Sequence, residues 1–267
     1  VDHQDYIGTN YSPRGSLIYT PLKGHIICFS AGGAFRNPAY IDLFTDLSLA
    51  GTVIAKGRRD LKPESIISVE LGYRASFIER LRANLGVFYN KIEDLIRTFG
   101  DYEDFPIRSI NYNGAEAIGG EVGLEYKITP WLSGLINYSY QEITYRELPS
   151  QELIYQDGEP IESNPKNKLN GGFRVTLKNG FSANILVHYV DTTKREYPII
   201  EELVPDWPLK RLDPYTLLTA RISYKLLDDR FEVALAGQNL LNDVHKGVPI
   251  IGEEIPLRVY GTLSARF

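Results

Sequence analysis

Hydrophobic and polar side chains alternate along most of this chain with a period of two. In residues 65–77, one face of the pattern is apolar and the other is polar or small. The apolar positions there are Val69, Leu71, Tyr73, Ala75 and Phe77. Because successive side chains of a β-strand point to opposite faces, this alternation predicts strands rather than helices.

The same pattern along the whole chain predicts eleven strands and an all-β fold in one domain, residues 1–267. The strands are expected at Ser12–Thr20, His25–Arg36, Ser65–Phe77, Leu81–Ile96, Ile107–Lys127, Trp131–Arg146, Asn167–Lys178, Phe181–Val190, Pro214–Lys225, Phe231–Asn239 and Pro256–Phe267. One short helix is expected in Pro38–Leu49, where Tyr40, Leu43, Phe44 and Leu47 recur at helical spacing.

The gaps between these strands are alternately short and long. The short gaps are Pro21–Gly24, Ile78–Arg80, Ile128–Pro130, Asn179–Gly180 and Leu226–Arg230. The long gaps are Asn37–Glu64, Arg97–Pro106, Glu147–Lys166, Asp191–Asp213 and about Leu240–Ile255. Tight turns at one end of a sheet and long loops at the other are typical of an antiparallel up-and-down transmembrane β-barrel.

Strand length separates this barrel from a soluble β-sandwich, whose strands also have one apolar and one polar face. The predicted strands Leu81–Ile96, Ile107–Lys127 and Trp131–Arg146 far exceed the usual strand of about 5 to 6 residues. A tilted membrane strand needs about 9 to 11 residues, so the excess would project beyond the bilayer. The lengths therefore favour a large barrel.

The number of strands indicates that this barrel is incomplete. If the short turns are periplasmic, eleven strands begin outside the cell and end in the periplasm. Bacterial single-chain barrels have an even number of strands and both ends in the periplasm. Open sheet edges are not tolerated in lipid. We therefore expect an odd number of further strands upstream of this sequence.

The amino-acid composition argues against some classes of partner and structure. The formal net charge of −5 argues against nucleic acid as a partner, because nucleic-acid binding needs a basic face. No apolar run reaches the roughly 18 to 20 residues of a membrane helix. The 18 tyrosines suit the aromatic girdles that membrane proteins place at the two lipid–water boundaries.

Several segments resemble one family in the order in which that family carries them. These are Ala34-Phe35-Arg36-Asn37-Pro38, Leu61-Lys62-Pro63-Glu64 followed by Glu70-Leu71-Gly72-Tyr73-Arg74, Phe88 to Ile96, Asn111-Tyr112-Asn113-Gly114-Ala115, Gly119-Gly120-Glu121-Val122, Asn164 to Lys168, Asn239 to Asp243 and Arg258 to Phe267. The chain is thereby similar to the C-terminal half of the β-barrel of TonB-dependent outer-membrane receptors.

The resemblance implies a barrel of about 22 strands around an N-terminal plug with a TonB box. This chain would supply the C-terminal eleven strands, without plug or TonB box. Implied partners are outer-membrane lipid, the missing barrel half and plug, the TonB complex through that plug, and the barrel assembly machinery, which would read the terminal Phe267. The implied ligand is a small-molecule metal chelate, and no cofactor is expected.

Candidate ligand contacts lie in the predicted outer loops, which the family would use to capture its ligand. Aromatic side chains suit a bulky ligand, and Arg or Lys would attract an anionic chelate. The candidates are Tyr102, Phe105, Tyr155, Arg195, Tyr197, Trp207, Lys210 and Arg211. Arg74, Arg174, Arg221 and Glu121 are instead expected to form a charge network on the inner wall.

Catalytic and metal sites are weakly indicated. The four histidines show no metal-ligand spacing, and no metal site is expected. Asp243 and His245 are close enough in sequence to form an acid–base pair, which leaves an outer-membrane hydrolase as one alternative. Asp101, Glu103 and Asp104 offer carboxylates for Ca²⁺, although a solvated loop explains them as well.

The sequence therefore favours part of a receptor for TonB-dependent uptake of a bulky, scarce nutrient in the outer membrane of a Gram-negative cell. By resemblance the ligand is a ferric siderophore, with cobalamin or an oligosaccharide next. A passive porin-like barrel and a truncated remnant without function remain as alternatives.

Overall fold

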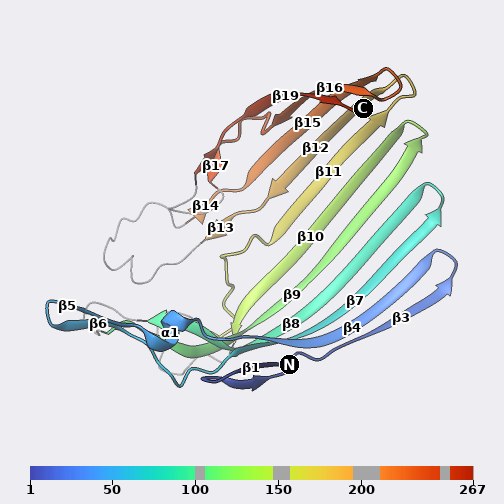
Figure 1. Cartoon of the computed structure of the whole chain (residues 1–267). Coiled ribbons are helices and arrows are strands. Elements are labelled where there is room, and N and C mark those ends of the chain that lie inside the picture. The colour runs from blue at the N-terminus through green and yellow to red at the C-terminus, as the bar shows by residue number, and fades with distance from the viewer. Residues whose placement is uncertain (100–105, 147–156, 195–210, 247–252, 267) are drawn as a thin grey trace.

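One large antiparallel sheet dominates the computed structural model, which describes residues 1–99, 106–146, 157–194, 211–246 and 253–266. The eleven strands of this sheet are β3 (Arg14–Leu22), β4 (His25–Arg36), β7 (Glu64–Ile78), β8 (Leu81–Phe99), β9 (Arg108–Thr129), β10 (Leu132–Arg146), β11 (Asn167–Thr176), β12 (Phe181–Val190), β15 (Tyr215–Leu226), β16 (Phe231–Gln238) and β19 (Arg258–Ala265). Each strand pairs with the next one along the chain. The sheet curves, with the tight turns at one end and the loop segments at the other (Figure 1).

All eleven predicted strands are confirmed, in the predicted order, with ends displaced by a few residues. The largest change is in β8, which continues to Phe99 instead of ending at Ile96. A bulge lets it do so: the register shifts between Ile92 and Leu95, and Asp94 adopts a φ of 57°. Such a bulge inserts an extra residue and increases local twist without ending the strand pairing.

The two faces of the sheet follow from its register, because residues directly opposite each other in paired strands share a face. Leu71 faces Val87 in this sense, Leu124 faces Ile136, and Ile222 faces Leu235. The outer face carries exposed apolar side chains across the whole sheet: Leu71, Val87, Val122, Leu124, Ile136, Leu169, Phe173, Ile185, Val187, Ile222, Leu235, Val259 and Leu263.

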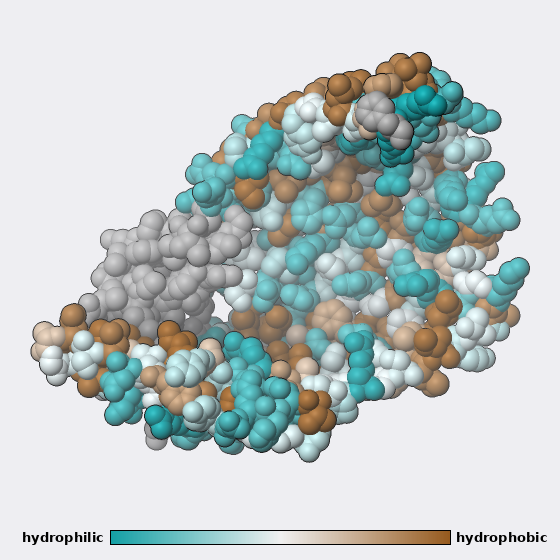
Figure 2. Space-filling view, viewed as in Figure 1, coloured by the Kyte–Doolittle hydropathy of each residue, from teal (hydrophilic) through white to brown (hydrophobic). Residues whose placement is uncertain are grey.

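The opposite face, lining the hollow of the sheet, is mainly polar. Its rows include Arg74 opposite Asn84, and Asn170 opposite His188. Figure 2 looks into this hollow, and hydrophilic side chains cover much of its middle. An apolar exterior around a polar interior is the arrangement of a membrane barrel wall and the inverse of a soluble sandwich.

Consistent with a single-layered wall, no large side chain among the described residues is fully buried. The few buried apolar side chains of any size include Leu43, Leu61, Tyr112 and Tyr145, which belong to the loop end of the sheet. Burial there comes from loop segments folding onto strand ends, and not from a second sheet.

The sheet is open in the described part of the chain, with β3 and β19 as its edges. Neighbouring strands alternate in direction, and the first and eleventh of an alternating series run the same way. Pairing β3 directly with β19 would therefore be parallel, unlike every other pair in the sheet. An odd number of intervening strands would restore the antiparallel pattern.

The expected helix in Pro38–Leu49 is wrong beyond its first half. Helix α1 spans only Tyr40–Phe44. Leu47 instead lies in β5 (Asp46–Leu49), which pairs with β6 (Thr52–Lys56). Ala50 and Gly51 have φ values of 49° and 84°, which close a tight turn. The backbone pairing of this hairpin outweighs the helical spacing of the apolar residues.

Small two-stranded hairpins complete the loop end. They pair β1 (Asp2–Gln4) with β2 (Gly8–Asn10), β13 (Thr193–Lys194) with β14 (Arg211–Leu212), and β17 (His245–Lys246) with β18 (Glu254–Ile255). Within the ranges given above, no helix has both the length and the apolarity needed to cross a bilayer.

The two faces should tolerate charge very differently. Val122 lies on the apolar outer face and its chain neighbour Glu121 on the inner face. Val122→Lys should destabilise the folded barrel, because a cation that faces lipid costs up to about 2 to 4 kcal/mol, depending on its depth in the bilayer. Glu121→Lys is the matched control and should fold normally. Heat-dependent electrophoretic mobility of the complete gene product measures both, and equal effects would contradict this assignment of faces.

Candidate functional site

The inner wall carries oriented arginines. Arg74 donates from Nε to Asn84 Oδ1 at 3.0 Å, and Arg174 makes the same contact with Asn184 at the same distance. Both pairs bridge neighbouring strands joined by a tight turn. Each asparagine fixes one edge of a guanidinium, leaving its other donors directed into the hollow, where they can meet water or an anionic group.

A second polar set continues along the wall. Arg221 donates to Ser223 Oγ at 3.1 Å and also to the carboxylate of Glu232. The ring of His188 contacts the amide of Asn170. The register places Arg74, Arg174, Arg221 and Glu121 on the inner wall, as predicted. Of the predicted charge network, the described contacts show the pair of Arg221 with Glu232, whereas Arg74 and Arg174 each contact an asparagine.

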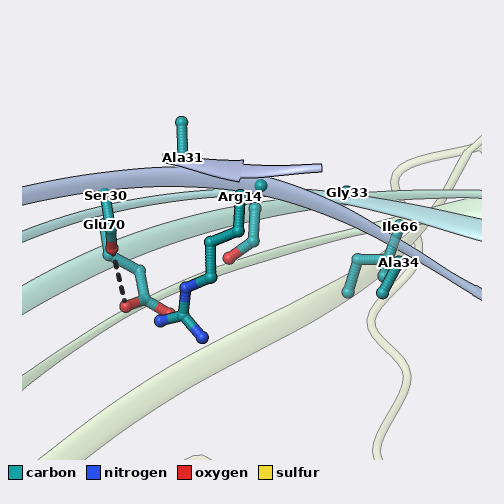
Figure 3. A pocket seen from close by; sticks show the side chains of 9 residues that line it. Arg14, Ser30, Ala31, Gly33, Ala34, Ile66 and Glu70 are labelled. Atoms are coloured by element: carbon teal, nitrogen blue, oxygen red, sulfur yellow. Dashed lines mark hydrogen bonds between the residues drawn. The ribbon is translucent and has the colours of Figure 1, made fainter. Parts of the chain in front are cut away.

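A shallow recess lies on the inner face beside the edge strand β3. Figure 3 shows Arg14 and Glu70 extending into it, with Ser30 donating to Glu70 Oε2 at 3.3 Å. The rest of its lining is small or apolar, from β4 and β7. Arg211, the one predicted ligand-contact residue in the described part of the chain, does not line this recess.

Of the eight predicted ligand contacts, only Arg211 falls in the described part of the chain. It lies in β14, is largely exposed, and donates from Nε to Thr192 Oγ1 at 3.1 Å. Its Nε is also 3.5 Å from Asp213. Outside the described residues lie Tyr102, Phe105, Tyr155, Arg195, Tyr197, Trp207, Lys210, the terminal Phe267 and the acidic set Asp101, Glu103 and Asp104.

The structure adds an arginine that sequence reasoning missed. The guanidinium of Arg97 lies 4.7 Å from the ring centroid of Tyr145 and 5.9 Å from that of Tyr112. It also donates to the Tyr145 hydroxyl. Both tyrosines are buried at the loop end, and this cation–π arrangement holds a fixed positive charge there. Its only sequence signal was an Arg at the end of a long strand.

A polar cluster caps the apolar outer face, above the positions expected in lipid. The Tyr89 hydroxyl donates to Glu116 Oε1 at 2.9 Å, and Arg146 Nε donates to Glu116 Oε2 at 2.8 Å. Arg146 also lies 3.7 Å from Asp157. The Arg146 hydrogen bond, with a smaller contribution from Tyr89, lowers the pKa of Glu116. We call Glu116, Arg146 and Asp157 the outer collar. Tyr89 connects the apolar, lipid-facing surface to this charged cluster.

The geometry argues against the acid–base pair that the sequence left open. His245 Nδ1 lies 2.8 Å from the backbone carbonyl oxygen of Asp243, and not from its carboxylate. That carboxylate accepts the Thr216 N–H at 2.7 Å. The His245 ring stacks on Tyr215 with centroids 3.9 Å apart. Both side chains thus secure the base of a loop.

Asn239 organises the same loop base. Its φ is 50°, and its Nδ2 donates to the carbonyl oxygens of Asp243 at 3.0 Å and Ile255 at 2.9 Å. The Asn242 N–H donates to the Asn239 carbonyl oxygen at 2.8 Å, so Asn239 begins a tight turn. Over the residues that the structure describes, no group of three or more His, Cys, Asp or Glu side chains is arranged to hold a metal ion.

Together, the apolar exterior, polar interior and one-sided loops define the wall of an outer-membrane β-barrel. The sequence matches the family described as "TonB dependent receptor-like, beta-barrel" over residues 1–240. The chain belongs to this family of outer-membrane receptors and transporters.

Among curated relatives, the chain is 30% identical over 187 residues to an iron-regulated outer membrane virulence protein of Vibrio cholerae. That alignment covers 64% of this chain and 27% of the relative, so the chain spans only a fraction of the relative's length.

Solved structures share the fold. A mutant form of the ferric enterobactin receptor PfeA of Pseudomonas aeruginosa matches with a TM-score of 0.73 at 19% identity, covering 99% of this chain and 41% of that one. The ferric-catecholate import receptor Fiu of E. coli K12 matches with a TM-score of 0.67 at 15% identity, covering 94% and 33%. The FrpB iron transporter of Neisseria meningitidis gives 0.64 at 15% identity, covering 95% and 39%.

The lowered pKa of Glu116 predicts how the outer collar responds to acid. A carboxylate with a depressed pKa stabilises the fold at neutral pH, and this contribution is lost as pH falls through the lowered pKa. A carboxyl ¹³C NMR titration of Glu116 should therefore have its midpoint below the ordinary glutamate value. In Arg146→Gln the midpoint should rise, because the first cause of the shift is removed. A midpoint that Arg146→Gln leaves unchanged would contradict the pairing.

Proposed function

We propose that this chain is the C-terminal half of the barrel of a TonB-dependent receptor that imports a ferric siderophore across the outer membrane. The observation that carries the proposal is family membership over residues 1–240, together with relatives whose names concern iron. The Vibrio cholerae protein is named as iron-regulated, and the PfeA, Fiu and FrpB titles name ferric enterobactin, ferric-catecholate import and iron transport.

Strand direction supports the half-barrel assignment. The edges β3 and β19 run the same way, so an odd set of further strands is needed to close the wall with antiparallel pairs alone. Two copies of this sheet around an axis normal to the membrane would meet through parallel seams. Eleven upstream strands give both antiparallel closure and the even total of bacterial barrels.

In the proposed receptor, this half supplies wall and loops, and the upstream half supplies the remaining wall and the plug. The outer loops capture the chelate, with Tyr102, Phe105, Tyr155, Arg195, Tyr197, Trp207, Lys210 and Arg211 as proposed contacts. The plug, coupled to the TonB complex, then opens the path. The inner-wall arginines Arg74 and Arg174 present their remaining donors to the plug surface or to the passing anion.

Two further partners belong to this proposal. The apolar outer face contacts outer-membrane lipid, and Phe267 serves as the assembly signal for the barrel machinery. No catalytic step is proposed, because the Asp243–His245 geometry secures a loop.

Uptake of ⁵⁵Fe separates this function from its alternatives. The complete gene, with whatever coding sequence lies upstream of Val1, is expressed in a strain lacking its own ferric-siderophore receptors. We expect uptake of a ferric siderophore at nanomolar concentration, falling to background when tonB is deleted. Ferric tris-catecholate, ferric tris-hydroxamate and cobalamin form the ligand panel.

The other outcomes are equally informative. Uptake that persists without TonB and rises linearly with concentration would replace the proposal with a passive porin. An open reading frame that begins at Val1, or a gene product absent from the outer membrane, would point to a remnant without transport activity.

A further inference from the structure

Two sequence motifs meet at the loop end of the sheet. Arg36, which ends β4, forms a bidentate pair with Glu64, which begins β7. Glu64 is only 7% exposed, and its Oε1 also accepts the backbone N–H of Ile96 in β8 at 2.8 Å. A buried carboxylate held by a guanidinium fork and a backbone donor fixes the ends of three strands relative to one another.

A third motif joins them through Asn111 of β9. Its Oδ1 accepts the Lys62 N–H at 2.8 Å, and its Nδ2 donates to the carbonyl oxygens of Lys62 and Asp94 at 2.9 Å each. One carboxamide therefore holds both the backbone N–H and the carbonyl oxygen of Lys62, and also the β8 bulge at Asp94. These three hydrogen bonds of the Asn111 side chain all go to backbone groups, so the side chain holds backbone segments in place.

These contacts fix the segment between β4 and β7 onto the end of the wall. Ser109 Oγ donates to Asp42 Oδ1 at 2.8 Å, and Lys56 N–H donates to the Ile107 carbonyl oxygen at 2.9 Å. Leu43 of this segment is buried. Gly57 passes so close to α1 that a Cβ there would lie 2.6 Å from the Leu43 carbonyl carbon. We call residues 37–63 the shelf; Figure 1 shows its α1, β5 and β6 beyond the loop end of the sheet.

The shelf exposes an aromatic and cationic surface. The Phe44 ring lies 4.5 Å from that of Tyr40 and 5.1 Å from that of Tyr6, which reaches it from the β1–β2 turn. The Arg59 guanidinium lies 5.2 Å from the Phe44 centroid. Tyr6 and Tyr40 are 71% and 77% exposed. Two exposed tyrosines and an arginine thus share contacts with one phenylalanine ring. Exposed aromatic side chains grouped with a cation form a surface suited to binding.

We propose that Tyr6, Tyr40, Phe44 and Arg59 form a contact surface for a ferric chelate with anionic aromatic arms, and that Asn111 is a positioning residue for it. The inference rests on the proposed uptake function and narrows its substrate class. The rings offer stacking faces and phenolic donors to planar aromatic arms. Arg59 supplies charge complementary to the anionic oxygens of the chelate.

The contribution of Asn111 is preorganisation. A contact surface held in its binding conformation loses less conformational entropy when the ligand arrives. Asn111→Asp places a carboxylate oxygen where Nδ2 donates to two carbonyl oxygens, which turns two attractions into repulsions. The shelf then loses its anchor at Lys62 while the surface residues remain unchanged.

The test measures the Kd of the purified complete receptor for a ferric tris-catecholate and for a ferric tris-hydroxamate, which lacks aromatic arms. Tyr40→Ala and Arg59→Gln should each weaken tris-catecholate binding about tenfold, through loss of one stacking or cation-mediated contact. Tyr11→Ala is the matched control, because Tyr11 is similarly exposed and takes no part in the cluster. The Tyr11→Ala variant should bind the tris-catecholate with the wild-type Kd.

A double-mutant cycle tests the positioning role. Asn111→Asp should also weaken tris-catecholate binding about tenfold, and combining it with Tyr40→Ala should cost clearly less than the product of the two single effects. The same substitution at the far end of the sheet, Asn179→Asp, keeps the acceptor for Phe181 N–H and should change nothing. Heat-dependent electrophoretic mobility checks that every variant is folded.

Each outcome decides between the two proposals. Wild-type binding of the tris-hydroxamate alone would overturn this inference and leave the uptake function intact. Full tris-catecholate affinity in Tyr40→Ala and Arg59→Gln would do the same. If the double variant loses affinity by the product of the two single effects, the contact surface stands, but Asn111 does not position it. A receptor that binds neither chelate would refute the uptake function itself.

Discussion

The fold depends on one constraint, which is that lipid offers no hydrogen-bond partner to a backbone N–H or C=O group. Every strand in the apolar belt must therefore pair on both sides. Nine of the eleven strands in the sheet do so, and only the edges β3 and β19 do not. The apolarity of lipid also explains why the alternation is inverted, with apolar side chains such as Val122 facing outward.

Outside the lipid, water and polar side chains can also pair with backbone groups, so the strand ends there have a different arrangement. Beyond the belt, the long strands β8, β9 and β10 carry polar groups on both faces, and large side chains such as Tyr112 and Tyr145 are buried. Glu64 and Asn111 there satisfy backbone groups that strand pairing leaves open. Loop segments held on such a base can keep a defined conformation without extensive regular secondary structure.

Sequence motifs in this family segment have a physical explanation in the structure. The Arg36 and Glu64 motifs are far apart in the chain, yet their side chains form one bidentate pair. Asn111 joins the second motif to the third through the Lys62 peptide. Arg36, Glu64 and Asn111, three of the residues that carry the resemblance, therefore hold the loop end of the sheet together.

The sequence by itself determined the strands, their order, their two faces and the short and long connections, because a period of two is a local property of each segment. It also placed Arg74, Arg174 and Arg221 on the inner wall through that period. Tertiary structure alone decided the rest. The β5–β6 hairpin replaced half of the expected helix, Asp94 entered a bulge, and His245 turned to a carbonyl oxygen instead of a carboxylate. These outcomes depend on contacts between distant residues, such as Ser109 with Asp42, which no local pattern encodes.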